Sequence, residues 1–170
     1  MKDGKFTHKD ILVLLLYTDN ATPIIGKTRI QKIVYLYEEE LHKQIGWDKK
    51  VVTKESSLFG FYPHYFGPFS DNLPIYLDEL IAFNIIEQEI IKNNSSPNKP
   101  VTKYTITNLG INYVESKLLK YIDSIKIDLL SEFKIKYNNM IRDDLLHYVY
   151  NKYELMTVKS IIKEQYVEGI

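Results

Sequence analysis

The 170-residue sequence contains no cysteine, which excludes disulfide bonds, thiolate metal ligands and a thiol nucleophile. Such a chain fits a reducing compartment, so we expect a cytoplasmic protein. An excess of one charge is also lacking, because 22 basic residues balance 22 acidic ones. The longest apolar run, Ile11 to Tyr17, is far shorter than the roughly 20 residues that cross a bilayer, and the first ten residues hold no signal core. We expect no membrane partner.

The composition is that of one globular domain, with 45% hydrophobic and 26% charged residues. A chain of 170 residues is long enough to bury one sizeable core and short for two. We predict a single compact domain in which residues 1–110 form the core unit and residues 111–170 form helices packed on it.

The stretch from Phe59 to Asn84 is the segment around which we expect the fold to be organised. An aromatic run that is extended in character leads to a break at Gly67-Pro68. After the break, apolar residues at helical spacing predict a helix buried along one side: Leu73, Tyr76, Leu77, Leu80 and Ile81. Pro74 requires this helix to begin at Ser70, Asp71 or Asn72, because proline is tolerated only in the first turn.

Two helices are predicted before this stretch. Thr7 and Asp10 have the spacing of a capping box for a helix over residues 8–19, with a strand as the competing interpretation of the run ILVLLLY. Thr28 and Gln31 have the same spacing for a second helix, which should end near His42. A polar loop anchored by Trp47 should follow.

After the organising stretch, the sequence predicts a hairpin and more helices. Residues 85–91 and 101–106 have strand character, and the asparagine-, serine- and proline-rich residues 93–100 form the turn. Thr107 or Asn108 should cap a helix over about 109–137, which either braces the domain or pairs with a second copy in a homodimer. Two further helices are expected at 141–153 and 157–166.

The order of these elements gives the fold class. Three helices followed by a two-stranded hairpin are typical of a winged helix-turn-helix. We therefore predict a mainly α protein with a small β wing (α+β), namely a winged helix-turn-helix core with extra C-terminal helices.

Four segments carry a family resemblance when taken in order. They are Gly26 to Leu36 (GKTRIQKIVYL), Tyr65 to Ser70 (YFGPFS), Tyr104 to Gly110 (YTITNLG) and Leu145 to Tyr153 (LLHYVYNKY). Together they resemble the YwgA-like family of small winged-helix-like proteins, which is distantly similar to the Panacea domain of phage-associated antitoxins. The resemblance implies a protein without enzyme activity, and it implies toxin neutralisation through protein contact.

DNA binding is the function that this fold suggests. The third helix of such a motif normally enters the major groove, yet residues 70–84 contain three acidic residues and no lysine or arginine. Phosphates would repel these charges, so we place DNA contact in the second helix and the wing. The candidate residues are Lys27, Arg29, Lys32, Lys92, Lys99 and Lys103. For the first three, a solvated helix face without a role is the alternative.

Protein contact is the second hypothesis. An acidic third helix behind an aromatic segment suits an antitoxin-like or adaptor protein with a protein partner such as a toxin. The candidate contact residues are Tyr62, Tyr65, Asp71, Asp78 and Glu79. The alternative for the aromatic residues Phe59, Phe61 and Phe66 is a place in the core.

A remote alternative is nucleotide binding. Residues 21–28 (ATPIIGKT) match a relaxed phosphate-loop pattern with Ala21 in place of the first glycine. Pro23 removes one cradle amide, and no strand with a terminal aspartate follows to hold magnesium. The four scattered histidines have no metal-ligand spacing. We therefore expect no enzyme activity, no cofactor and no metal.

Overall fold

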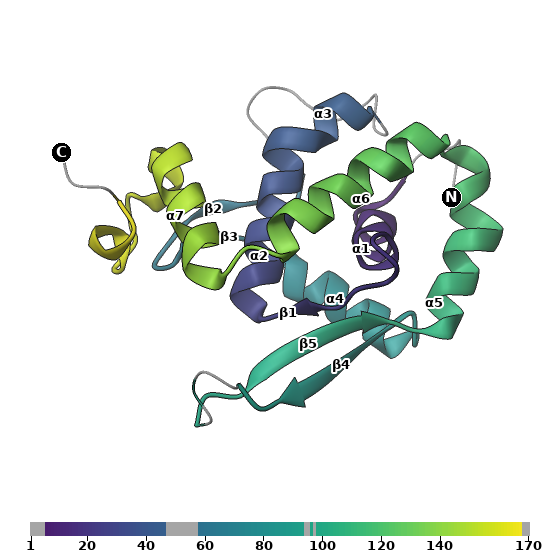
Figure 1. Ribbon diagram of the computed structural model, residues 1–170, viewed down its shortest axis with the longest axis horizontal. Helices are drawn as coiled ribbons and strands as arrows, with labels where there is room; N and C mark the ends of the chain where they lie inside the picture. The colour runs from purple at the N-terminus through teal and green to yellow at the C-terminus, as the bar shows by residue number, and fades with distance from the viewer. Residues whose placement is uncertain (1–5, 47–57, 94–95, 97, 168–170) are drawn as a thin grey trace.

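The computed structural model describes residues 6–46, 58–93, 96 and 98–167 (Figure 1). The described chain is mainly helical with two small antiparallel sheets. The α helices are α1 (His8–Tyr17), α2 (Lys27–Leu36), α3 (His42–Ile45), α4 (Asn72–Ala82), α5 (Asn108–Tyr113), α6 (Ser124–Asn138) and α7 (Arg142–Lys152). The strands are β1 (Ile24–Ile25), β2 (Tyr62–His64), β3 (Gly67–Phe69), β4 (Ile86–Ile91) and β5 (Val101–Ile106). The predicted Trp47 loop lies outside the described residues.

The first helix has the predicted start. The Thr7 hydroxyl accepts a hydrogen bond from the Asp10 amide, and the Asp10 carboxylate accepts one from the Thr7 amide. This confirms the capping box, and the helix excludes the strand interpretation. The chain leaves α1 at Thr18 through Asp19, Asn20 and Ala21, which all have positive φ.

Helix α2 is buried around most of its circumference. All seven residues from Ile30 to Leu36 are buried, including Gln31 and Lys32. The predicted cap was wrong, because Gly26 is the N-cap and Gln31 is used elsewhere. The helix continues past the predicted end through a π-helical turn, Tyr37–Leu41, into α3.

Side chains of α2 hold the backbone of the organising stretch. The Gln31 amide donates to the Ser70 carbonyl at 2.9 Å and accepts from the Ser70 amide at 3.0 Å. The Lys32 ammonium donates to the carbonyls of Phe66 and Pro68 at 2.6 and 2.8 Å. Within the described chain, β2 and β3 form a sheet of two strands, so these side chains satisfy backbone groups that no further strand reaches.

Helix α4 begins where Pro74 requires. The Ser70 hydroxyl donates to the Phe59 carbonyl and accepts from the Leu73 amide, which links the aromatic segment to the first turn. Of the predicted stripe, Leu73, Leu77 and Leu80 are buried, and the other two members are half-buried.

The predicted hairpin of β4 and β5, which we name the wing, has an added strand. Strands β4 and β5 pair antiparallel from Ile86 opposite Ile106 to Ile91 opposite Val101. Strand β1 pairs with the other edge of β5 and gives the order β1-β5-β4. Sequence reasoning missed β1 because two residues carry no periodicity. Strand β4 is an edge on which Glu87 and Glu89 are exposed.

The motif that closes the wing has a steric explanation. The Thr107 hydroxyl caps α5 by accepting from the Gly110 amide, and it lies within donating distance of the Asn84 carbonyl. A Cβ on Gly110 would lie 2.2 Å from the Ile85 carbonyl oxygen, so glycine alone fits. The helix predicted over 109–137 was wrong, since α5 passes through π and 3-10 turns and ends before Ile122, and α6 begins anew at Ser124.

The C-terminal part contains α7 as predicted, but the helix expected at 157–166 was wrong. The chain after α7 forms 3-10 turns at Glu154–Thr157 and Lys163–Gln165, and its Ile161 amide donates to the Tyr65 carbonyl. In Figure 1, α7 and this segment lie at the end opposite α5, and the β4–β5 hairpin runs along the lower edge. One buried cluster draws side chains from both predicted parts of the chain, including Leu14, Ile33, Leu130 and Val149.

The π turn of Tyr37–Leu41 places one carboxylate among tyrosines from the C-terminal helices. Glu40 accepts hydrogen bonds from Tyr148 and Tyr153, from Tyr137, and from the Lys152 ammonium at 2.9 Å. Burial alone would raise the pKa of this carboxyl, but these hydrogen bonds outweigh it and lower the pKa to about 2.

We expect Glu40→Gln to lower the free energy of unfolding at neutral pH by about 2–4 kcal/mol, because several donors lose an ionic acceptor. Urea unfolding measures this loss. The pKa of Glu40 is lower in the folded state, so the wild-type advantage is full above the unfolded pKa near 4.5 and shrinks as pH falls toward 2. Glu39→Gln on the exposed side of the same turn is the control, and an equal effect of both changes would contradict the assignment.

Candidate functional site

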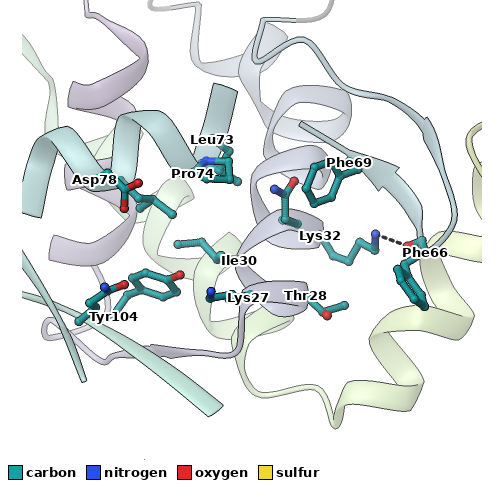
Figure 2. Close-up of a pocket in the computed structure, with 13 residues that line it drawn as sticks. Lys27, Thr28, Ile30, Lys32, Phe66, Phe69, Leu73, Pro74, Asp78 and Tyr104 are labelled. Carbon is teal, nitrogen blue, oxygen red and sulfur yellow. Dashed lines mark hydrogen bonds between the residues drawn. The ribbon is translucent and has the colours of Figure 1, made fainter. Parts of the chain in front are cut away.

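A groove of about 410 Å³ opens between the start of α2, the first two turns of α4, the β3 strand and the wing (Figure 2). The residues that line it are Lys27, Thr28, Ile30, Gln31, Lys32, Phe66, Phe69, Leu73, Pro74, Leu77, Asp78, Gln88 and Tyr104. Its volume lies within the usual range for sites that bind small molecules.

The floor of the groove is apolar. Ile30 comes from α2, and Leu73 and Leu77 lie one turn apart on α4, so the packing of these two helices makes the floor continuous. Phe66 is 49% exposed at the rim. An apolar floor with an aromatic rim favours an apolar side chain as occupant.

The wing supplies a polar wall. Gln88 and Tyr104 are opposite each other in the β4–β5 ladder and therefore share the face turned to the groove. Tyr104 is only 4% exposed, and its hydroxyl has no hydrogen-bond partner among the described residues. Burial, and then the nearby Asp78 carboxylate, raises the pKa of this phenol.

The start of α2 forms the third side. Its N-cap, Gly26, has φ +108° and offers no side chain, so no side-chain oxygen caps the first amides of the helix. Lys27 is exposed beside it, while Asp78 is exposed on the α4 side. The groove thus has a positive and a negative end.

Lys32 lines the groove but is not a surface cation. It is 2% exposed, and its ammonium donates to the Phe66 and Pro68 carbonyls. Burial, helped by the Arg142 charge, lowers the pKa of this lysine to about 7.

The six candidate DNA-contact residues differ in burial and in the partners of their side chains. Arg29 donates to the carbonyls of Tyr137, Asn138 and Met140, where it terminates α6. Lys32 is buried, and Lys103 forms an ion pair with Glu89 at 3.1 Å. Within the described chain, Lys27, Lys92 and Lys99 are the exposed candidates whose side chains have no charged or hydrogen-bonded partner.

The candidate partner contacts are also divided. Tyr62 donates to Asp71 at 3.1 Å, and Glu79 forms an ion pair with Lys9 at 2.7 Å. Tyr65 is 59% exposed beside the C-terminal segment, and Asp78 alone among them lines the groove. Of the aromatic residues considered for the core, Phe59 and Phe61 are buried and Phe66 is not.

Residues 21–28 do not form a loop of converging amides. The motif includes β1, and the amides of Ala21, Thr22 and Gly26 donate to carbonyls within the chain. A phosphate cradle needs such amides free and convergent, so this segment offers no support for nucleotide binding.

No helix in the part of the chain that the structure describes is long and apolar enough to cross a bilayer. No group of three or more histidine, aspartate or glutamate side chains in that part of the chain is arranged to hold a metal ion.

Comparison of the chain with protein-family models, with curated proteins and with solved structures gives no match. Function is therefore inferred from the groove and from the charges around it.

Sequence reasoning missed three residues of the groove that matter most. Gln88 and Tyr104 lie opposite each other because of the register of β4 and β5. The sequence does not reveal this register, because the long polar turn of residues 93–100 is compatible with more than one pairing. Gln31 was assigned to a helix cap, because its spacing from Thr28 suits a capping box. The sequence signal that these three residues share is a polar side chain at a position that the periodicity of its helix or strand places on the inward face.

We expect the Lys32→Met variant to change how stability depends on pH. The folded pKa of Lys32, about 7, is below its unfolded value, so the unfolded chain binds more protons between about pH 7 and 10. The wild-type free energy of unfolding should therefore rise relative to Lys32→Met over this range, by at most about 1.4 kcal/mol per pH unit. Urea unfolding at pH 6 to 10 measures the difference, and a flat difference would contradict a buried, titrating amine.

Proposed function

We propose that this chain is a non-enzymatic protein-binding module of the adaptor or toxin-neutralising kind. Its groove between α2, α4 and the wing receives a segment of a partner protein. The observation that carries the proposal is an open, apolar-floored groove beside a helix that has no basic residue.

The order of elements supports a winged helix-turn-helix origin for this module. Helices α1, α2 and α4, with β1 before α2 and the β4–β5 hairpin after α4, follow the helix-strand-helix-helix-strand-strand order of such domains. Residues 37–71 then form an insertion between the second and third helices. In this interpretation α4 occupies the position of the DNA-reading helix.

The surface of α4 favours protein over DNA in that position. Asp71 and Asp78 are exposed, so this helix would face phosphates with negative charge. Three of the six candidate cations are committed inside the protein or to an ion pair. The groove, in contrast, offers apolar surface between one positive and one negative residue, which suits a segment with complementary charges.

A matched pair of variants tests the proposal. Gln88 and Glu87 are adjacent and exposed on β4, but only Gln88 lines the groove. We expect Gln88→Tyr to obstruct the groove and weaken partner binding at least about tenfold, and Glu87→Tyr to leave it unchanged. Tagged wild-type and variant proteins are used to capture partners from nuclease-treated native extract, and affinities are then measured with the purified partner.

Recovery of a stoichiometric partner that Gln88→Tyr alone abolishes is the expected result. Equal recovery by both variants would remove the groove from the interface. Recovery of the protein alone, as a monomer in sedimentation, would contradict the proposal, and a concentration-dependent dimer would identify a second copy as the partner.

DNA binding through the wing and α2 is the second candidate. The observation in its favour is that Lys27, Lys92 and Lys99 are exposed and unpaired within the described chain. Three phosphate contacts predict a slope of about −2.7 for log K against log salt concentration. Fluorescence anisotropy with duplex DNA measures it, and no binding at low salt would exclude this candidate.

A further inference from the structure

We propose that the groove binds a free carboxylate at the end of an apolar chain, namely the C-terminus of the partner protein with its last side chain on the groove floor. This inference rests on the proposed protein-binding function and names the part of the partner that is recognised.

The hydroxyl of Tyr104 is the first observation. Tyr104 is only 4% exposed, and its hydroxyl has no hydrogen-bond partner in the described chain. Figure 2 shows the ring extending into the groove with its oxygen on the side of Lys27. The ring is buried, while the hydroxyl oxygen stays accessible at the groove and can donate a hydrogen bond to an occupant.

The start of α2 is the second observation and is independent of the first. The helix has ten residues, and Gly26 leaves its first amides without a side-chain cap. Thr28 also lines the groove, and its hydroxyl has no partner among the described residues. Uncapped amides at a helix start favour an anion, and the exposed Lys27 ammonium supplies a full positive charge.

The charge balance favours a monoanion. Lys27 is the one lysine on the groove lining that is free to pair, because the Lys32 ammonium donates to two backbone carbonyls. Asp78 is on the opposite side, where it would repel a phosphate dianion more strongly than a carboxylate. The Asp78 carboxylate can also accept a hydrogen bond from a peptide N–H of the partner segment that leads into the groove.

The apolar floor of the groove favours an apolar group attached to the carboxylate of the ligand. Ile30, Leu73 and Leu77 are 3%, 0% and 3% exposed, and they form an apolar surface below the polar groups. A chain end places a carboxylate and an apolar side chain on one carbon, which fits these neighbouring surfaces. A free organic acid shares this chemistry, and the experiment separates the two sources.

The test uses acetylated tripeptides Ala-Ala-Leu and Ala-Ala-Phe, each with a free or an amidated C-terminus. The readout is amide chemical shifts of the isotope-labelled full-length protein. We expect saturable shifts for residues 26–30, Gln88 and Tyr104 with the free carboxylate, and at least about tenfold weaker binding of the amidated peptides. Equal binding of both forms, or no shift at these residues, would overturn the inference.

Variants and competing anions complete the test. Tyr104→Phe and Lys27→Met should each weaken binding of the free carboxylate about threefold or more and leave the amidated peptide unchanged. Lys117→Met, exposed on the segment after α5, is the matched control. Tighter binding of phenyl phosphate or of octanoate than of the peptides would assign the site to a phosphoryl group or a free acid and overturn the chain-end proposal.

The two proposals fail separately. Capture of a partner that Gln88→Tyr abolishes, together with no response to any peptide, would refute only the carboxylate site. A response to the free carboxylate with no captured partner would refute the protein-binding function and leave a carboxylate site without a protein ligand.

Discussion

Buried backbone carbonyls satisfied by side chains from other helices are the constraint on which this structure depends. The segment from Phe59 to Ser70 is partly buried, and its own sheet consists of two three-residue strands. Gln31 and Lys32 supply the donors that a neighbouring strand would supply in a larger sheet. Arg29 and Lys134 do the same for the C-terminal ends of α6 and α1.

This arrangement links the core to the candidate site. Ser70 bonds to Gln31 of α2, and its hydroxyl accepts from the Leu73 amide in the first turn of α4, so hydrogen bonds beside the groove hold α2 and α4 together. A groove held in this way loses little conformational freedom when a ligand enters, which favours binding. The same contacts turn Lys32 inward, and this leaves Lys27 as the exposed cation and Asp78 as the exposed anion of the groove.

Local patterns in the sequence were sufficient for much of the fold. The capping box of Thr7 and Asp10, the stripe of Leu73, Leu77 and Leu80, and the β4–β5 hairpin follow from spacing alone. The break at Ile122 was not predictable, because the apolar spacing continues across it and only tertiary packing chooses two helices. The π turn at Tyr37–Leu41 is likewise invisible to a 3.6-residue period.

The candidate site was less predictable than the fold. A lysine on a helix is expected to be exposed to solvent unless the segment that packs over it is known. The sequence therefore could not show that Lys32 is buried and Lys27 is exposed. Tyr104 and Gln88 face the groove only because of a cross-strand register. Each depends on contacts between residues distant in sequence, which composition and periodicity do not encode.

The edge strand β4 also restricts how copies of this protein can associate. An antiparallel pair of two β4 strands centred on Gln88 would set Glu87 of each copy opposite Glu89 of the other. Like charges in such positions disfavour the pairing, so growth of a continuous sheet from wing to wing is opposed at its first step. A strand of basic character meets no such repulsion, so this edge favours a basic strand over the β4 strand of a second copy.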